Sequence, residues 1–185
     1  MNSNKEKFWK LLEPEYEKAM IFCRKLMNNR EKGDDLYQDS IVLAIRKLQQ
    51  LRDQKSFRPW FYQIIMSGFK SSFRKSKLRQ FVPFTQDTES SMSSDDPTEA
   101  QLAKVKLEKL LKVLSAYERG LIVLYELEGW TIGEIAELYK KTEGSIKLKL
   151  FRARNKLKTE LKRLSKINAP VWSNVKDEYL KNYAL

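Results

Sequence analysis

The sequence predicts an all-α protein that consists of two small helical domains joined by a flexible linker, the second with a helix-turn-helix. The first reason is composition, because Leu, Lys, Glu and Ala fill the periodic stretches and only six Gly and five Pro occur among 185 residues. Such a composition favours helices. The second reason is the stretch PFTQDTESSMSSDDPTEAQ at 83–101, which has five acidic residues, no basic ones and four Ser. Few of its groups could bury apolar area, so we interpret it as a linker, with a structured loop as the alternative.

The acidic stretch divides the chain into four segments. We predict a first helical domain at 1–80, the linker at 81–98, a second helical domain at 99–166 and a C-terminal extension at 167–185. In the extension, Trp172, Val175 and Tyr179 have the spacing of a short amphipathic helix, and a disordered tail is the alternative.

Positive charge is concentrated on both sides of the linker. The net charge is +12, to which residues 52–79 contribute 8 − 1 = +7 and residues 131–166 contribute 11 − 4 = +7. A basic protein of this size is attracted to polyanions, chiefly nucleic acid or an anionic membrane. No apolar run approaches the roughly 20 residues that span a bilayer, and the N-terminus lacks the apolar core of a secretory signal. Together with a single Cys, Cys23, which lies in an apolar context, this predicts a cytoplasmic protein.

Residues suited to catalysis are scarce. Histidine is absent, which removes the commonest general base and metal ligand, and neither GxxxxGK[ST] nor GxGxxG occurs. A nucleic-acid enzyme could use the carboxylates of Asp34, Asp35 and Asp39 with Mg²⁺, but helix capping explains these residues more simply. We therefore expect no catalytic residues, no metal, no cofactor and no small-molecule substrate.

The first domain contains a helix with an acidic and polar face. Residues 34–51, DDLYQDSIVLAIRKLQQL, begin with two Asp that favour a helix N-terminus. Asp35, Gln38 and Asp39 share one face of this helix at i, i+3 and i+4. An acidic patch on a basic domain is a candidate protein-binding surface, and ordinary solvent exposure is the alternative.

The next stretch, SFRPWFYQIIMSGFKSSFRKSK at 56–77, interleaves aromatic residues with cations. Rings that stack on bases and charges that meet phosphates suit single-stranded nucleic acid. Phe57, Trp60, Phe61 and Ile64, however, run at helical spacing, so we expect most of the rings to be core and the basic residues to make the contacts.

The second domain is expected to open with a capped helix. Thr98 is a good N-cap, and Gln101 three residues later completes a capping box. The predicted apolar stripe of this helix consists of Leu102, Val105, Leu110 and Leu114.

Residues 131–157, TIGEIAELYKKTEGSIKLKLFRARNKL, predict two abutting helices, of which Thr131 and Thr142 are the N-caps. Ala136 is small enough to let two helices cross closely, and Ile146 ten residues later supplies an apolar partner. This spacing is that of a helix-turn-helix. Lys140 occupies the turn, where Gly is common because the residue often needs a positive φ, and a non-Gly residue there costs about 1 kcal/mol.

The second of these helices has a buried stripe and a basic outer face. The stripe is formed by Ile146, Leu150, Ala153, Leu157, Leu161 and Leu164. The remaining face is expected to enter the major groove, where Lys and Arg reach guanine edges or phosphates and apolar side chains touch thymine methyls. The predicted DNA contacts are Ser145, Lys147, Leu148, Lys149, Phe151, Arg152 and Lys156. A solvated basic face is the alternative.

Between about residues 10 and 165 the chain resembles the bacterial RNA polymerase sigma factors of the extracytoplasmic-function (ECF) group. The resemblance is carried by DDLYQDSIVLAIRKL, SFRPWFYQII and LSAYERGLIVLYELEGWTIGEIAELYKKTEGSIKLKLFRARNKL, whose order and spacing agree with that family. It implies two helical domains, regions 2 and 4, and a function that needs no active site. The implied partners are the RNA polymerase core enzyme, through the clamp helices of its largest subunit and its flap, promoter DNA, and an anti-sigma factor that can hold the protein at the membrane.

The resemblance also assigns roles to residues. Asp35, Gln38 and Asp39 match the surface that docks on the clamp helices, and the helix from Thr142 matches the reader of the upstream (minus-thirty-five) element. The loop at 51–56 and the helix after it match the part that melts and reads the downstream (minus-ten) element on the non-template strand. That match implies contacts from Arg52, Lys55, Arg58, Ser67, Lys70 and Arg74.

The chain departs from the family at two of these positions. Ser67 stands where many members have Asn, and Leu148 stands where a small polar residue is frequent. Both departures concern the promoter bases and not the class. The leading alternative is a stand-alone helix-turn-helix regulator that binds duplex DNA without polymerase, which leaves the 34–77 region without a role.

Overall fold

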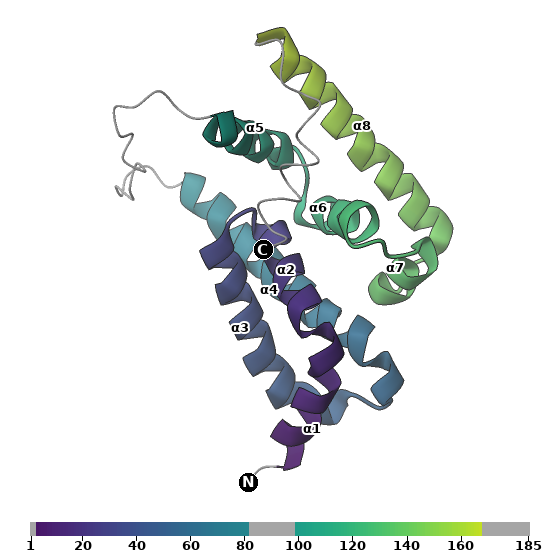
Figure 1. The fold of residues 1–185 in the computed structure, drawn as a ribbon. Helices are drawn as coiled ribbons and strands as arrows, with labels where there is room; N and C mark the ends of the chain where they lie inside the picture. The colour runs from purple at the N-terminus through teal and green to yellow at the C-terminus, as the bar shows by residue number, and fades with distance from the viewer. Residues whose placement is uncertain (1–2, 82–98, 168–185) are drawn as a thin grey trace.

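The computed structural model describes residues 3–81, here called the first half, and residues 99–167, the second half. All regular structure within these two ranges is helical, which confirms the all-α class (Figure 1). The first half contains α1 (Ser3–Leu12), α2 (Tyr16–Met27), α3 (Arg30–Lys47) and α4 (Phe57–Phe81), with short 3-10 turns at Glu13–Glu15, Leu48–Gln50 and Gln54–Ser56. The predicted linker, the Thr98 cap and the predicted helix of the C-terminal extension lie outside the described residues.

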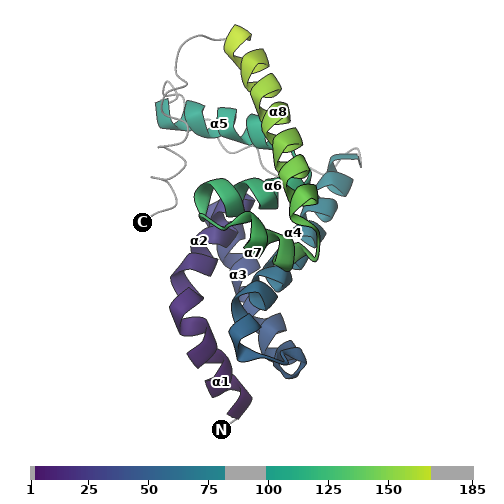
Figure 2. The same cartoon turned by 90° about the vertical axis from the view of Figure 1, so that its right-hand side faces the viewer.

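The second half consists of four α-helices and one π-helical turn. They are α5 (Glu99–Lys112), α6 (Ala116–Ile122), η4 (Val123–Leu127, the π turn), α7 (Ile132–Tyr139) and α8 (Glu143–Ile167). Two views show α6 and α7 against the first half and α8 along their outer side (Figures 1 and 2). None of the helices in the described part of the chain has both the length and the apolar character that a membrane crossing requires.

Helix α3 begins four residues earlier than the sequence predicts. Asn29 is its N-cap and accepts a hydrogen bond from the backbone N–H of Lys32 at 2.9 Å. Asp34 therefore lies inside the helix, where its carboxylate receives bonds of 2.6 and 3.1 Å from the guanidinium of Arg24 on α2. The prediction that Asp34 and Asp35 start this helix was wrong, because the amide of Asn29 supplies a cap one turn earlier.

The contact between α2 and α3, here called the α2–α3 seam, is so close that it requires a glycine at position 33. A Cβ built on Gly33 would lie 2.5 Å from the Cα of Arg24, which is backbone and cannot swing aside. This close approach lets Arg24 reach Asp34 and buries the apolar side of α2, including Cys23.

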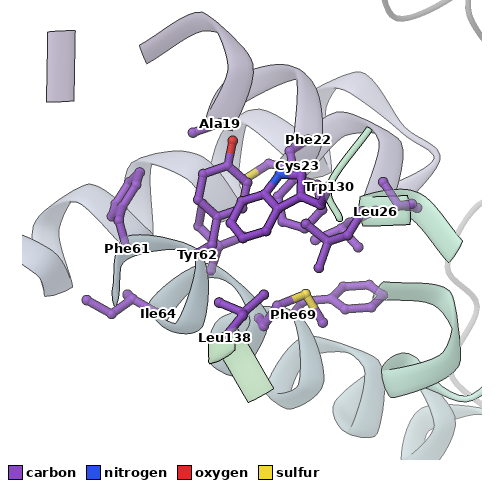
Figure 3. Close-up of a cluster of buried hydrophobic side chains, with 14 of the residues drawn as sticks. Ala19, Phe22, Cys23, Leu26, Phe61, Tyr62, Ile64, Phe69, Trp130 and Leu138 are labelled. Atoms are coloured by element: carbon purple, nitrogen blue, oxygen red, sulfur yellow. The ribbon is translucent and has the colours of Figure 1, made fainter. Parts of the chain in front are cut away.

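The two halves pack together through one continuous hydrophobic core. Figure 3 shows Trp130 and Leu138 of the second half among Phe22, Tyr62 and Phe69 of the first half. The ring centroids of Trp130 and Tyr62 are 4.8 Å apart, and Trp130 is 3% exposed. The two halves are thus in direct contact through buried side chains.

The predicted rings of α4 are indeed core, since Phe57, Phe61 and Ile64 are buried and Trp60 is half-buried. The predicted stripe of α5 is only half right. Leu110 and Leu114 are buried, whereas Leu102 and Val105 are 44% and 48% exposed, because α5 extends past the helices that could cover its first turns (Figure 1).

Candidate nucleic-acid and polymerase interfaces

The acidic face of α3 lies open to solvent. Asp35, Gln38 and Asp39 are all exposed, and Val42 beside them is 50% exposed. The opposite side of the helix is anchored in the core by Leu36 and Tyr37. Because the buried side fixes the orientation of the helix, the two carboxylates and the amide form one exposed patch with Val42 at its C-terminal end.

The same helix does not form a metal site. Asp34 is paired with Arg24, and no group of three carboxylate, Cys or His side chains gathers to bind a metal ion within 3–81 and 99–167. The Mg²⁺ hypothesis for Asp34, Asp35 and Asp39 therefore has no support in the geometry, since one of its three carboxylates is already neutralised.

The six cations and polar residues predicted to contact the melted strand do not form a single open surface. Five of them are exposed, namely Arg52, Lys55, Ser67, Lys70 and Arg74, and Arg58 is half-buried. Asp53 caps the short turn before α4 by accepting from the N–H of Lys55 at 3.0 Å, and this holds the loop that carries Arg52 and Lys55. These exposed residues could meet a nucleic acid without any rearrangement.

Two of the six, the half-buried Arg58 and the exposed Lys70, contact the second half. The Nη1 of Arg58 lies 3.1 Å from a carboxylate oxygen of Glu134, and its guanidinium lies 4.2 Å from the ring centroid of Trp130. The ammonium of Lys70 lies 5.7 Å from the ring of Tyr139 and 5.8 Å from that of Tyr117. Both distances are within the range of cation–π attraction.

The helix-turn-helix has the predicted caps. Glu134 N–H donates to Thr131 Oγ1 at 3.2 Å and Thr131 N–H donates to the Glu134 carboxylate at 2.8 Å, which is a complete capping box. The backbone and side-chain hydrogen bonds from Thr131, joined by Arg58, lower the pKa of Glu134. Lys140 has φ = 51°, so the expected left-handed turn is confirmed. Ser145 N–H donates to Thr142 Oγ1 at 3.3 Å, the expected start of α8.

Burial on α8 follows the predicted stripe. Ile146, Leu150 and Ala153 are buried, and Leu157 is half-buried against the core. The outer face of the first three turns is open: Leu148 is 49% exposed and Phe151 is 61% exposed. The polar residues predicted around them are exposed at Lys147, Lys149, Arg152 and Lys156 and half-buried at Ser145.

Two cations of α8 hold the helix to the rest of the second half. Lys156 Nζ lies 2.7 Å from the carboxylate of Glu118, and Arg154 Nε lies 2.7 Å from that of Glu126. Burial raises the pKa of Glu118, but hydrogen bonds from Lys156 and Ser115 outweigh this effect and the net pKa is lowered. Lys156 is therefore an anchored cation, meaning one that is paired with a carboxylate of the same chain, rather than a bare one. Its spacing on the helix does not reveal this distinction.

Comparison with known proteins identifies the family of the chain. The family Sigma-70 region 2 matches residues 11–79, and the family Sigma-70, region 4 matches residues 104–157. The chain belongs to the sigma-70 family, in its ECF group. It is an RNA polymerase sigma factor, a protein that initiates transcription.

Individual relatives are distant but cover most of the chain. RNA polymerase sigma factor YlaC of Bacillus subtilis is 27% identical over 150 residues, 79% of this chain and 87% of that protein. ECF RNA polymerase sigma factor EcfG of Rhodopseudomonas palustris is 24% identical over 136 residues, 74% of this chain and 75% of that protein. The solved structure of the sigma factor RpoE in complex with the anti-sigma factor NepR from Bartonella quintana matches with a TM-score of 0.56 and 25% identity. It covers 85% of this chain and 96% of that one.

Trp130, Glu128 and Lys25 are structurally prominent residues to which sequence reasoning gave no role. They join the two halves of this sigma factor, and the only signal for them in the sequence is the dipeptide Gly129-Trp130 just before the helix-turn-helix. Gly129 has φ = +68°, a conformation that favours glycine and that turns the chain to point Trp130 at the first half.

Proposed function

We propose that this sigma factor docks on core RNA polymerase through Asp35, Gln38 and Asp39. The observation that supports this assignment is an exposed acidic patch, bordered by the exposed Val42, on a chain whose net charge is +12. Electrostatic complementarity selects partners and fixes their register, so a negative patch on a positive protein favours one orientation on a basic partner.

In the same proposal the outer face of α8 reads the upstream promoter element. A helix that presents Lys147, Leu148, Phe151 and Arg152 from its first turns offers cations to phosphates and guanine edges and apolar groups to thymine methyls. The exposed ring of Phe151 supports this role, because together with the exposed Leu148 three residues earlier it places two large apolar side chains next to each other on the surface, as at a binding site.

The first half captures the melted non-template strand through Arg52, Lys55, Arg58, Ser67, Lys70 and Arg74. The free energy for strand opening comes from captured bases and from polymerase contacts, so the protein needs no catalytic residue of its own. Working with polymerase places it in the cytoplasm. The RpoE structure is a complex with an anti-sigma factor, and an inhibitor of this kind is a partner that we propose for this chain too.

A reconstituted reaction tests the proposal. The purified chain is added to core polymerase with total DNA from its own genome, and transcription start sites are mapped. We expect initiation at a limited set of positions that share an upstream and a downstream element. Transcripts that begin at the same positions with and without the chain would overturn the proposal, as would a stable complex with an operator but none with polymerase.

A further inference from the structure

Two pairs of large apolar side chains are exposed on helices of the second half. The pair of Leu148 and Phe151 lies on the outer face of α8, which the proposed function uses to contact DNA. The other pair is Leu102 and Val105 on α5, which are 44% and 48% exposed. They are three residues apart, so they are neighbours on the surface of the helix. The proposed function gives this second pair no role.

The exposed pair of α5 faces away from the side that packs on the core. Leu110, Leu111 and Leu114 are buried and attach the last turns of α5 to the rest of the second half. With 3.6 residues per turn, Val105 projects about 140° away from Leu110 around the helix axis. Helix α5 therefore cannot bury Val105 by rotating about its axis unless it exposes Leu110.

The last turns of α8 are also only partly covered. The stripe of this helix is buried at Ile146 and Ala153 but only half-buried at Leu161 and Leu164. Helix α5 packs against α8, and both views place the first turns of α5 and the last turns of α8 at the same end of the molecule, where the two helices diverge (Figures 1 and 2). Apolar groups of both helices are thus incompletely covered at this end.

The sequence that follows α8 has a complementary apolar pattern. Residues 168–185 include Trp172, Val175, Tyr179 and Tyr183, at positions i, i+3, i+7 and i+11. This spacing places all four on one narrow side of a helix. A stripe of that length covers about three helical turns of a neighbouring surface.

This segment is close enough to reach α5. Pro170 is a residue that ends helices, so the sequence predicts that the chain leaves the axis of α8 there. The four residues 168–171 between the end of α8 and Trp172 span up to about 14 Å when they are extended, and α8 is itself in contact with α5. So short a tether gives the segment an effective concentration in the millimolar range at the surface of α5.

Charge favours this segment over a second copy of the chain as the occupant. Each copy has a net charge of +12, so two copies repel each other. Residues 168–185 instead contain Lys176 and Lys181 against Asp177 and Glu178, a net charge of 2 − 2 = 0. The segment can therefore approach the basic second half without this repulsion.

We infer that residues 168–185 form an amphipathic helix that packs its apolar stripe on the first turns of α5. Trp172, Val175 and Tyr179 cover Leu102 and Val105. The two aromatic rings bury a large area for a helix of this length, which compensates for the cost of ordering it. The added helix completes the outer end of the second half, and this surface of α5 is occupied by the chain itself.

Paramagnetic broadening of amide signals in the whole chain tests this inference. A nitroxide is attached to Lys181→Cys in a Cys23→Ala background, because position 181 lies about half a turn from Trp172 and so points away from the packed stripe. We expect the amide signals of residues 102–106 to be lost. The signals of α1, which lies at the opposite end of the molecule in both views, should keep their intensity (Figures 1 and 2).

A variant of α5 with a matched control defines the surface that is covered. Val105→Asp places a charge in the apolar contact and should restore the lost signals. Thr159→Asp adds the same charge at an exposed position of α8, roughly half a turn from Leu161, and should leave them lost. Because both positions are exposed, circular dichroism should show the same helix content in both variants.

A second pair of variants tests the stripe of the segment. Trp172→Ser removes its largest apolar group and should also restore the signals of residues 102–106. Asn174→Ser lies about half a turn from Trp172 around the same helix and should have no effect. Equal effects of the two substitutions would contradict packing through the stripe.

A mixed sample separates the segment of the same chain from that of a second copy. An isotope-labelled chain without nitroxide is mixed with an unlabelled chain that carries it, and residues 102–106 of the first should keep their full intensity. A loss of intensity in the mixture would assign the surface to a second copy, and full intensity in both samples would leave it to a different protein. Either result would overturn the inference. Neither polymerase nor DNA takes part in these measurements, so their outcome is independent of the proposed function.

Discussion

The side of α4 that contacts the second half and the outer face of α8 have similar cations but opposite environments. Arg58 on α4 is matched by Glu134 at 3.1 Å and covered by Trp130. Arg152 on α8 is exposed, next to a Phe151 that is 61% exposed. The difference shows that a basic stretch of sequence is not necessarily an exposed binding surface. Carboxylates and aromatic rings elsewhere in the same chain can contact its cations. The proposed duplex reader is exposed, whereas Arg58 of the proposed strand binder is partly covered by the second half.

The largest expected effect is on stability, and it comes from a comparison of a glycine in a tightly packed site with a glycine in an open site. Gly33→Ala places a Cβ 2.5 Å from the backbone of Arg24, so we expect a loss of about 3 kcal/mol in the free energy of unfolding. Gly144→Ala, at the open start of α8 with nothing within 4 Å of the added Cβ, should instead gain about 0.5 kcal/mol. Urea unfolding measures both, and equal effects would mean that the α2–α3 seam is looser than it appears.

The next effect compares the two open faces, the acidic one on α3 and the basic one on α8. Asp39→Arg should weaken binding to core polymerase by about 30-fold, because it reverses one charge of the proposed docking patch. The helical fold should persist, since the side chain is exposed. Glu17→Arg is the matched control, an equal charge change at an exposed position of α2. If polymerase affinity survives Asp39→Arg in a pull-down titration, the docking face is misassigned.

A smaller effect tests whether the open face of α8 is used. Arg152→Ala should weaken binding to the upstream element by about tenfold and reduce the salt slope of the affinity by about one, as expected for one lost phosphate contact. Lys162→Ala is the charge-matched control, ten residues or about 15 Å further along the helix. Fluorescence anisotropy at several salt concentrations measures both, and an unchanged slope for Arg152→Ala would contradict a phosphate contact.

The smallest effect compares the bare Arg152 with the anchored Lys156. The pKa of Glu118, which holds Lys156, is lowered in the folded protein. Its contribution to stability is therefore complete above the unfolded pKa of about 4.3 and is lost as the pH falls through the folded value. Glu118→Gln should cost about 1 kcal/mol at neutral pH and flatten the decline in stability between about pH 5 and pH 3.

Urea unfolding across that pH range measures this change. Glu108→Gln, at an exposed position of α5, is the control and should leave the pH profile as it is. A profile that is equally steep in Glu118→Gln would show that the bond to Lys156 does not stabilise the fold.

Local features were accessible from the sequence because their causes are local. The capping box of Thr131 and Glu134, the left-handed Lys140 and the buried stripe that begins at Ile146 each depend on residues within a few positions of one another. Even local reasoning failed at α3, where Asn29 took the capping role that had been given to Asp34 and Asp35. Two good caps lay within five residues, and the pairing of Asp34 with Arg24 on another helix decided between them.

The sequence by itself determined that this protein is helical, that its charge is positive on both sides of an acidic stretch, and that one helix offers a basic outer face. Periodicity and capping depend on residues within one or two helical turns of one another, so the sequence alone reveals them. Only the tertiary structure decided which cations are open, because the partners of Arg58 and Lys25 are 76 and 103 residues away. Contacts at such separation depend on how the halves pack, and no local pattern encodes them.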